Sequence, residues 1–241
     1  AGSGAEGNGV LSPYRGMACD ADLVLVDNAA DNASLIDPKD YYKYTYATDA
    51  LGFKYIFDYA KRVNKPCVIN FSEGSTQDVH GYDQLYYELL AKLVGPGRII
   101  VASAGNDGAR KTYIHKTKGQ ERAGAFIMSN EKRFSCTAKS KQPFTFRVSV
   151  YDNAASPTIV DVSTVNICSA QDSLLTDTLS VGGKKYIWRV LAYPNSYDVS
   201  ETAYDFQLSS PSKVGDSPQV SLQVIGRDAD IELYRMSGYM F

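Results

Sequence analysis

The sequence predicts an α/β segment followed by an all-β antiparallel sandwich. In the first 110 residues, short apolar runs alternate with segments of helical periodicity. After residue 110, apolar and polar residues alternate in short runs that turn signals separate. With 241 residues, 44% of them hydrophobic, the chain is long enough to bury two modest cores. We therefore expect two domains, residues 1–110 and 111–241.

The first segment reads as strand, helix, strand, helix, strand. Its three apolar runs are Leu23–Val26, Pro66–Phe71 and Arg98–Ala102. A helix is expected from Phe53 to Val63, where apolar residues recur at helical spacing, and Asn64-Lys65-Pro66 ends it. A second helix is expected from Tyr82 to Leu93. Short turns between these elements imply right-handed crossovers and a parallel sheet with helices on both faces.

The second segment contains alternating runs typical of half-buried antiparallel strands, and no helix is expected there. The clearest runs are Phe144–Tyr151, Ile159–Ile167, Lys185–Tyr193 and Val220–Ile225. Trp188 lies in the middle of one run, and the chain has 18 tyrosines. These aromatic residues are interpreted first as packing and sheet cover, with a sugar-binding platform as the alternative.

Composition excludes several classes of partner. A net charge of −2 and a pI near 5.7 provide no basic footprint for nucleic acid. No apolar run approaches the ~20 residues that a membrane-spanning helix needs. We therefore expect neither a nucleic-acid partner nor a membrane span.

The cysteines and aspartates do not predict a metal site. The four cysteines lack CxxC spacing; Cys19 and Cys67 are expected as buried thiols, whereas Cys136 and Cys168 could pair. Five aspartates are scattered near the N-terminus in a spacing that does not match a calcium loop, and a solvated face is the simpler interpretation. They are Asp20, Asp22, Asp27, Asp31 and Asp37. No metal and no cofactor are expected.

The most informative motif follows the third apolar run, at Gly105-Asn106-Asp107-Gly108. It places an amide side chain after a buried strand, among small residues. An amide held in this way could donate a hydrogen bond to charge developing on a substrate oxygen, as in an oxyanion hole. The alternative is an ordinary Asn-Asp-Gly turn.

Three motifs in the same order resemble those of subtilisin-like serine peptidases. They are Tyr14-Arg15-Gly16-Met17-Ala18 before Ala21-Asp22-Leu23, then Val68-Ile69-Asn70-Phe71-Ser72-Glu73-Gly74, then Ala102-Ser103-Ala104-Gly105-Asn106-Asp107-Gly108. The resemblance covers roughly residues 1–110 and implies a partial subtilisin-like sheet. The sandwich would then be a jelly-roll-like insertion between the oxyanion asparagine and the nucleophile segment.

The resemblance also implies roles for individual residues. Asn106 would be the oxyanion-hole donor. Ser72, Glu73 and Gly74 would form the strand that pairs with substrate, and Ala102, Ser103, Ala104 and Gly105 would form a wall of the substrate pocket. Glu73 replaces the apolar residue usual in the family, which leaves substrate preference open, and Cys19 stands where the family usually has proline.

The catalytic Asp, His and Ser motifs of that family are missing from the chain. The histidines His80 and His115 lack the family context, and Ser3 and Ser237 lack an evident base. We therefore expect an internal piece of a larger peptidase, beginning just past its histidine and ending before its nucleophile, and inactive by itself. Its partner would be a polypeptide substrate of the parent enzyme, with an extracellular or cell-envelope location implied by the family. A truncated sheet could also self-associate.

Two alternatives remain open from the sequence alone. The first is a non-catalytic relative, or a β-sandwich module, that binds protein or glycan through Trp188 and the tyrosines. The second is an unrelated doubly wound binding domain with Ser72 and Asn106 at the carboxyl ends of its strands, although it lacks a GxGxxG phosphate loop.

Overall fold

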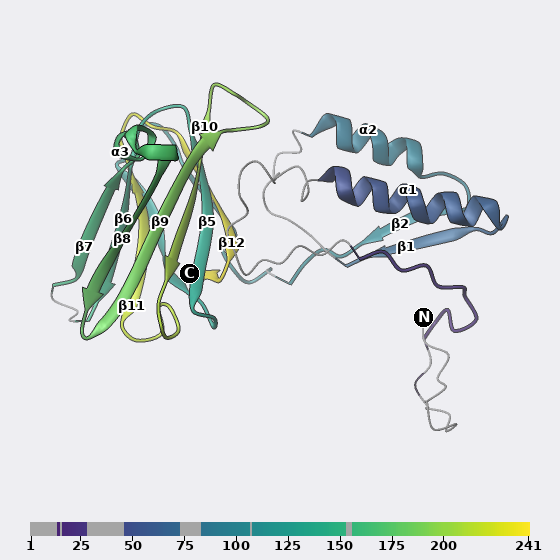
Figure 1. Cartoon of the computed structure of the whole chain (residues 1–241), viewed down its shortest axis with the longest axis horizontal. Coiled ribbons are helices and arrows are strands. Elements are labelled where there is room, and N and C mark those ends of the chain that lie inside the picture. Colours follow the sequence, from purple (N-terminus) through teal and green to yellow (C-terminus); the bar gives the residue numbers. More distant parts are fainter. Residues whose placement is uncertain (1–13, 15, 28–45, 73–82, 107, 153–155) are drawn as a thin grey trace. The chain divides into compact units, whose positions relative to one another are not determined.

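The computed structural model in Figure 1 describes residues 14, 16–27, 46–72, 83–106, 108–152 and 156–241. The chain divides into two compact units. One consists of residues 1–71 and 85–101, and the other of residues 72–84 and 102–241. The first contains a small α/β core, and the second is a β-sandwich.

The α/β unit is built from α1 (Tyr46–Arg62), β1 (Cys67–Phe71), α2 (Gln84–Leu93) and β2 (Arg98–Ala102). β1 and β2 form a two-stranded parallel sheet. Both predicted helices are confirmed, as are the second and third predicted strands. A β-α-β connection joins the two strands, because parallel neighbours cannot be linked by a tight hairpin.

The first helix ends where the sequence predicts. Asn64 adopts a left-handed φ of 52°, the conformation that terminates many helices. The Lys65 amide donates to the Ala60 carbonyl at 3.0 Å, and the Asn64 amide donates to the Lys61 carbonyl at 3.2 Å. This pair of bonds is the Schellman arrangement, and Pro66 then prevents the helix from continuing.

The core of this unit lies on one face of the small sheet. Phe53 and Phe57 of α1 are buried against Ile69, and the Phe53 and Phe71 rings meet edge to face at 5.0 Å. On the two strands, Val68, Ile99 and Val101 are 64%, 52% and 51% exposed. The expectation of helices on both faces of the sheet is therefore wrong for the described part of this unit.

The first predicted strand is also wrong. Leu23–Val26 has no regular secondary structure, and Leu25 is 86% exposed. An apolar run becomes a strand only where a neighbouring strand satisfies its backbone groups, and the run has no such neighbour among the described residues. Most of the regular structure is antiparallel β, so the expected α/β fragment of a subtilisin-like peptidase is not what this chain forms.

The second unit confirms the predicted antiparallel sandwich (Figure 1). Its six-stranded sheet has the order β3 (Tyr113–Lys116), β12 (Ile231–Ser237), β5 (Arg133–Ser140), β10 (Thr202–Ser209), β9 (Lys184–Pro194) and β8 (Leu174–Val181). Its five-stranded sheet has the order β13 (Tyr239–Met240), β4 (Arg122–Met128), β11 (Gln219–Ile225), β6 (Thr145–Tyr151) and β7 (Thr158–Ser163).

Alternating side chains from the two sheets fill the space between them. On β11, Val220, Leu222 and Val224 are at most 1% exposed. Phe146 of the five-stranded sheet stacks on Phe206 of the six-stranded sheet, with ring centroids 5.5 Å apart. The single continuous core explains why the alternating runs predict this part of the fold well.

The chain between β7 and β8 differs from the prediction. The expected strand Ile159–Ile167 stops at Ser163, and α3 (Thr164–Ser169) follows it. The Thr164 hydroxyl accepts from the Phe144 amide and donates to the Phe144 carbonyl, both at 2.9 Å. These bonds, together with the complete burial of Ile167, favour one helical turn over further strand. The expectation of no helix in this region is therefore wrong.

Trp188 lies in the sandwich core, and the four cysteines differ in their burial. Trp188 is 7% exposed and belongs to the sandwich core, which supports the packing interpretation. None of the four cysteines forms a disulfide, so Cys136 and Cys168 do not pair. Cys136 is buried, whereas Cys19 and Cys67 are only partly buried, contrary to the expectation for the latter two.

Candidate functional site

The predicted site residues follow the ends of β1 and β2. Ser72 comes directly after β1, and the chain from Ser103 to Asn106 comes directly after β2. Because the strands are parallel, both segments leave the same edge of the small sheet. Glu73 and Gly74 lie outside the described residues, as does Asp107.

The segment after β2 has an open, irregular backbone. Ala102, Ser103, Ala104 and Gly105 are all exposed. Gly105 has a φ of 82°, and a side chain added there would meet no atom within 4 Å. Such a stretch leaves room for another backbone to approach, as the proposed pocket wall requires.

Asn106 is exposed and lines a polar hollow of about 360 Å³ in the second unit. This volume lies within the usual range for ligand sites. The lining is rich in hydrogen-bond donors. Besides Asn106 it contains Arg110, Ser129, Asn130, Glu131, Arg235, Ser237, Gly238 and Tyr239.

The hollow depends on the reversal of the chain between β12 and β13. Gly238, between them, has a φ of 80°. A Cβ at this position would lie 2.8 Å from the Met128 carbonyl oxygen and 2.8 Å from Phe134. Only glycine fits both constraints, and it brings Tyr239 onto β4 opposite Met128.

Tyr239 and Gly238 organise the charged side chains. The Arg110 guanidinium lies over the Tyr239 ring, 4.1 Å from its centroid. Asn130 donates through Nδ2 to the Tyr239 hydroxyl at 3.4 Å. Arg235 donates to the Gly238 carbonyl at 3.0 Å. Both guanidinium groups are therefore held in place by contacts within the chain.

Of the predicted site residues that the structure describes, only Asn106 lies in this hollow. Asn106 lines it, whereas Ser72 and the residues from Ala102 to Gly105 do not. The neighbours of Asn106 were not predicted, because Arg110, Arg235 and Tyr239 meet only through the pairing of distant strands. The one local signal was the Ser-Gly step at Ser237-Gly238, which is typical of a sharp turn.

Among the described residues, the candidate nucleophile Ser237 and the candidate base His115 do not belong to a catalytic triad. The Ser237 and Ser135 hydroxyls lie 2.9 Å apart. His115, on β3, lies 2.7 Å from Asp230 through Nε2, and both side chains are exposed. Ser3 and His80 lie outside the described residues. A His–Asp pair is one part of a hydrolytic triad, but among the described residues it orients no serine.

Beside this pair, the outer face of the six-stranded sheet carries a tyrosine and carboxylate cluster. Tyr113 donates to Glu232 at 2.8 Å, and Tyr234 also donates to Glu232. Burial and the neighbouring Glu232 carboxylate raise the pKa of Tyr234 well above its usual value. Lys139 lies over the Tyr234 ring at 4.9 Å. The cluster is an internal hydrogen-bond network, which fixes the face rather than leaving groups poised for proton transfer.

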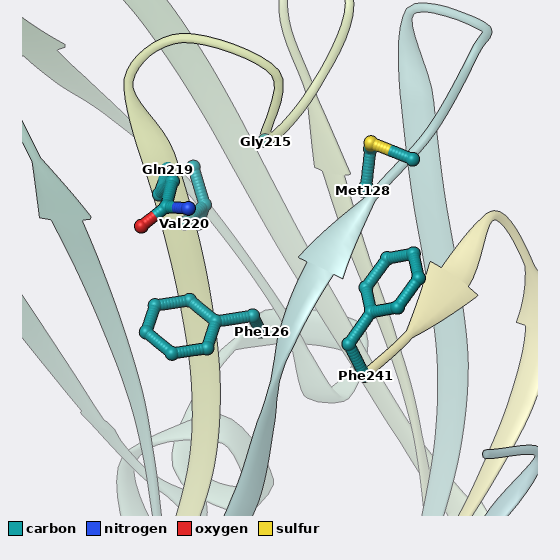
Figure 2. Close-up of a pocket in the computed structure, with 6 residues that line it drawn as sticks. All are labelled: Phe126, Met128, Gly215, Gln219, Val220 and Phe241. Atoms are coloured by element: carbon teal, nitrogen blue, oxygen red, sulfur yellow. The ribbon is translucent and has the colours of Figure 1, made fainter. Parts of the chain in front are cut away.

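A second hollow, of about 260 Å³, lies on the outer face of the five-stranded sheet (Figure 2). Phe126 and Met128 project from β4 beside Phe241, and Val220, Gln219 and Gly215 complete the lining. Phe126 also packs against Tyr151 at 5.6 Å. The lining is mostly apolar, in contrast with the hollow around Asn106.

Acidic and thiol side chains do not gather into a metal-ligand cluster in the described chain. Within the described ranges, no group of three His, Cys, Asp or Glu side chains could hold a metal ion. Asp22, one of the scattered aspartates, forms an ion pair with Lys65. Neither α1 nor any other helix of the described residues is long and apolar enough to cross a membrane.

Sequence comparisons do not place the chain in a family. No family model matches it, and no curated protein resembles it in sequence. Among solved structures, the Clostridium perfringens CspB protease is similar, with a TM-score of 0.50 and 16% sequence identity. The match covers 79% of this chain but only 39% of that protease chain.

The comparison shows that this chain shares its fold with part of that protease chain, and nothing finer. At 16% identity it shows the shared fold alone. The resemblance to subtilisin-like peptidases rested on three short motifs, and the mostly β structure overturns the family assignment drawn from them. Apolar runs followed by small and polar residues are what any buried strand and turn require, so these motifs do not by themselves show a family.

Proposed function

We propose that this chain is part of a serine endopeptidase in which Asn106 binds the oxygen that becomes negatively charged during peptide-bond attack. The observation that carries the proposal is the place of Asn106: an exposed amide beyond the end of β2, on the wall of a donor-rich hollow. The similarity of its fold to part of the CspB protease chain supports the same activity.

The chemistry requires little from this chain beyond positioned donors. A side-chain amide aimed at a developing oxyanion stabilises the transition state more than the ground state, so it acts on kcat. The exposed stretch from Ala102 to Gly105, and Ser72 after β1, would lie along the substrate backbone. The nucleophile and its base would be supplied by the rest of the enzyme.

The test uses the full-length product of the gene that encodes this chain. Asn106→Ala should lower kcat for a peptide substrate by about 10²- to 10³-fold with little change in KM, as removal of a single oxyanion-hole donor generally does. Asn166→Ala, at an exposed asparagine of α3, is the matched control and should leave both constants unchanged.

Three results would contradict the proposal. The first is a full-length protein without peptidase activity or fluorophosphonate labelling. The second is an Asn106→Ala enzyme with unchanged kcat. The third is fluorophosphonate labelling of the 241-residue chain by itself, because that would place the nucleophile inside it.

A further inference from the structure

In the described part of the sandwich, the two sheets end in the edge strands β3, β8, β13 and β7, and the first three are poor templates for a further strand. β3 has only four residues. β13 has two, and Met240 on it also bridges to Lys111. On β8, the Asp177 carboxylate accepts from the Thr178 amide at 2.6 Å, and Asp177 lies opposite Trp188, on the face of the core. Short edges and inward-facing charges are features that prevent the addition of a foreign strand.

β7, at one side of the sandwich, has none of these features (Figure 1). It has six residues, Thr158–Ser163, or about 20 Å of strand, without proline, lysine or bulge. Thr158, Val160 and Val162 lie opposite buried residues of β6, so no charge on β7 faces the core. Alternate backbone groups of an edge strand point away from its neighbour. On β7 these groups form no backbone hydrogen bond with other described residues.

The one charged side chain of β7 is neutralised within the chain. Arg147 of β6 donates to the Asp161 carboxylate through Nε at 2.7 Å and through Nη2 at 2.6 Å. These bonds lower the pKa of Asp161 below its usual value, so the ion pair persists at neutral pH. Beside it on the outer face, Ile159 is 48% exposed. The edge therefore offers free backbone groups and β-branched side chains without an unpaired charge.

We propose that β7 pairs antiparallel with β7 of a second copy of this chain, so that the two five-stranded sheets become one continuous sheet. A two-fold axis makes such a contact isologous, and the free backbone groups of one copy are satisfied by the same groups of the other. Residues that lie opposite each other in an antiparallel pair share a face. Core-facing residues must therefore oppose core-facing residues, which restricts the possible registers.

The chemistry of the strand selects one of the registers that match faces. An axis through Asp161 would place the two Asp161 carboxylates directly opposite each other, which is unfavourable. An axis through Ile159 would bring Pro157, which has no N–H group, into the pairing. An axis through Val160 avoids both conflicts.

The register centred on Val160 uses the strand's own residues to complete the contact. Thr158 lies opposite Val162, and Val160 lies opposite its copy, so β-branched side chains meet on the face of the core. On the outer face, Ile159 lies opposite Asp161, whose charge Arg147 already balances. Because β7 is self-complementary in this way, a second copy is the occupant that its edge fits.

The test is sedimentation velocity of the 241-residue chain between about 10 μM and 1 mM. A six-residue edge is small beside the roughly 800 Å² per partner of a standard interface, so we expect a weak dimer that forms as the concentration rises. In the same samples, hydrogen exchange of the segment Thr158–Ser163 should slow as the dimer forms. This second measurement needs no variant.

Two substitutions at Ile159 test the contact and its register. Ile159→Asp places a second carboxylate opposite Asp161 of the other copy and should weaken the dimer by about 10-fold or more. Ile159→Lys places an opposite charge there and should weaken it by no more than about 3-fold. Phe126→Asp is the matched control, because Phe126 is 45% exposed on β4 of the same sheet, and it should leave association unchanged. Circular dichroism verifies that each variant is folded.

A monomer at every concentration up to 1 mM would overturn the proposal, as would a dimer in which exchange of β7 does not slow. Equal weakening by Ile159→Asp and Phe126→Asp would place the contact elsewhere and also overturn it. Equal loss with Ile159→Asp and Ile159→Lys would exclude the register centred on Val160, and with it the pairing proposed. Dimerisation does not depend on the proposed peptidase role, so either can fail without the other.

Discussion

The glycine between β12 and β13 provides a direct test of how the polar hollow is built. Gly238→Ala introduces two separate costs. The first is a non-glycine residue at a φ of 80°, which costs about 1–2 kcal/mol. The second is a methyl group placed 2.8 Å from a backbone carbonyl oxygen and 2.8 Å from Phe134, closer than real Cβ contacts allow. Forced shifts of this kind cost about 1–3 kcal/mol.

A matched variant separates these two costs. Gly183, in the turn between β8 and β9, has a similar φ of 76°, but a Cβ there would meet nothing within 4 Å. Gly183→Ala should therefore lower the free energy of unfolding by the conformational term alone, about 1–2 kcal/mol. Gly238→Ala should lower it by about 2–5 kcal/mol, because the steric term is added.

The assay is urea unfolding followed by tryptophan fluorescence. Trp188 is the only tryptophan in the chain and is 7% exposed in the sandwich core, so its signal reports on the sandwich and not on the α/β unit. Equal destabilisation by Gly183→Ala and Gly238→Ala would refute the reasoning, because it would mean that the close approach of Gly238 to Met128 and Phe134 contributes nothing.

Three further predictions concern the rest of the sandwich. Phe206→Ala should lower the free energy of unfolding by about 3–5 kcal/mol in the same urea titration, because the ring is 1% exposed and stacks in the core; a loss below about 1 kcal/mol would contradict this packing. Hydrogen bonds from Lys141, and then from the Ser200 hydroxyl and amide, hold the pKa of Asp198 at about 2, below the usual 3.8. The contribution of this carboxylate to stability is therefore complete above about pH 4 and disappears as the pH falls toward 2. Lys141→Met should make this part of a stability-versus-pH curve shallower, because only the Ser200 bonds remain, and an unchanged curve would count against the Lys141–Asp198 pair. In the native protein a thiol reagent should modify the exposed Cys168 but not the buried Cys136, because burial raises the pKa of the Cys136 thiol well above 9.0. The modified positions are mapped by mass spectrometry, and rapid labelling of Cys136 in the native protein would contradict its placement.

Strand prediction succeeded where alternation is strict and failed where small residues interrupt it. In β11, Val220, Leu222 and Val224 alternate with polar residues, so the pattern predicts both the strand and its buried face. β4 was not predicted, because its first half is built from Ala123, Gly124 and Ala125, which lack the β-branched and aromatic residues typical of strands. A Cβ on Gly124 would lie 2.3 Å from the Leu222 carbonyl oxygen, so the small residue is required by strand approach.

The candidate site was predictable in only one of its parts. The Gly-Asn-Asp-Gly signature draws attention to Asn106 because turn residues after an apolar run place a polar side chain at a strand end. Arg110 and Arg235 carry no local signal of meeting. Arg110 is positioned by the Tyr239 ring, and Tyr239 by its pairing with β4. Such contacts form only when strands distant in the sequence pair, so the local sequence around each arginine does not predict them.

Burial and sheet size now discriminate between the functional alternatives. A sugar that stacks on Trp188 would require the core to open, because the indole is 7% exposed, so this residue does not form a binding platform. A doubly wound domain binds its ligand where the strand order of an open sheet reverses, and the described parallel sheet has only two strands. On the described surface, the Asn106 amide lines one hollow, and the exposed rings of Phe126 and Phe241 line another. An accessible side-chain amide is what the proposed peptidase role requires of this chain, because an oxyanion must reach its donor.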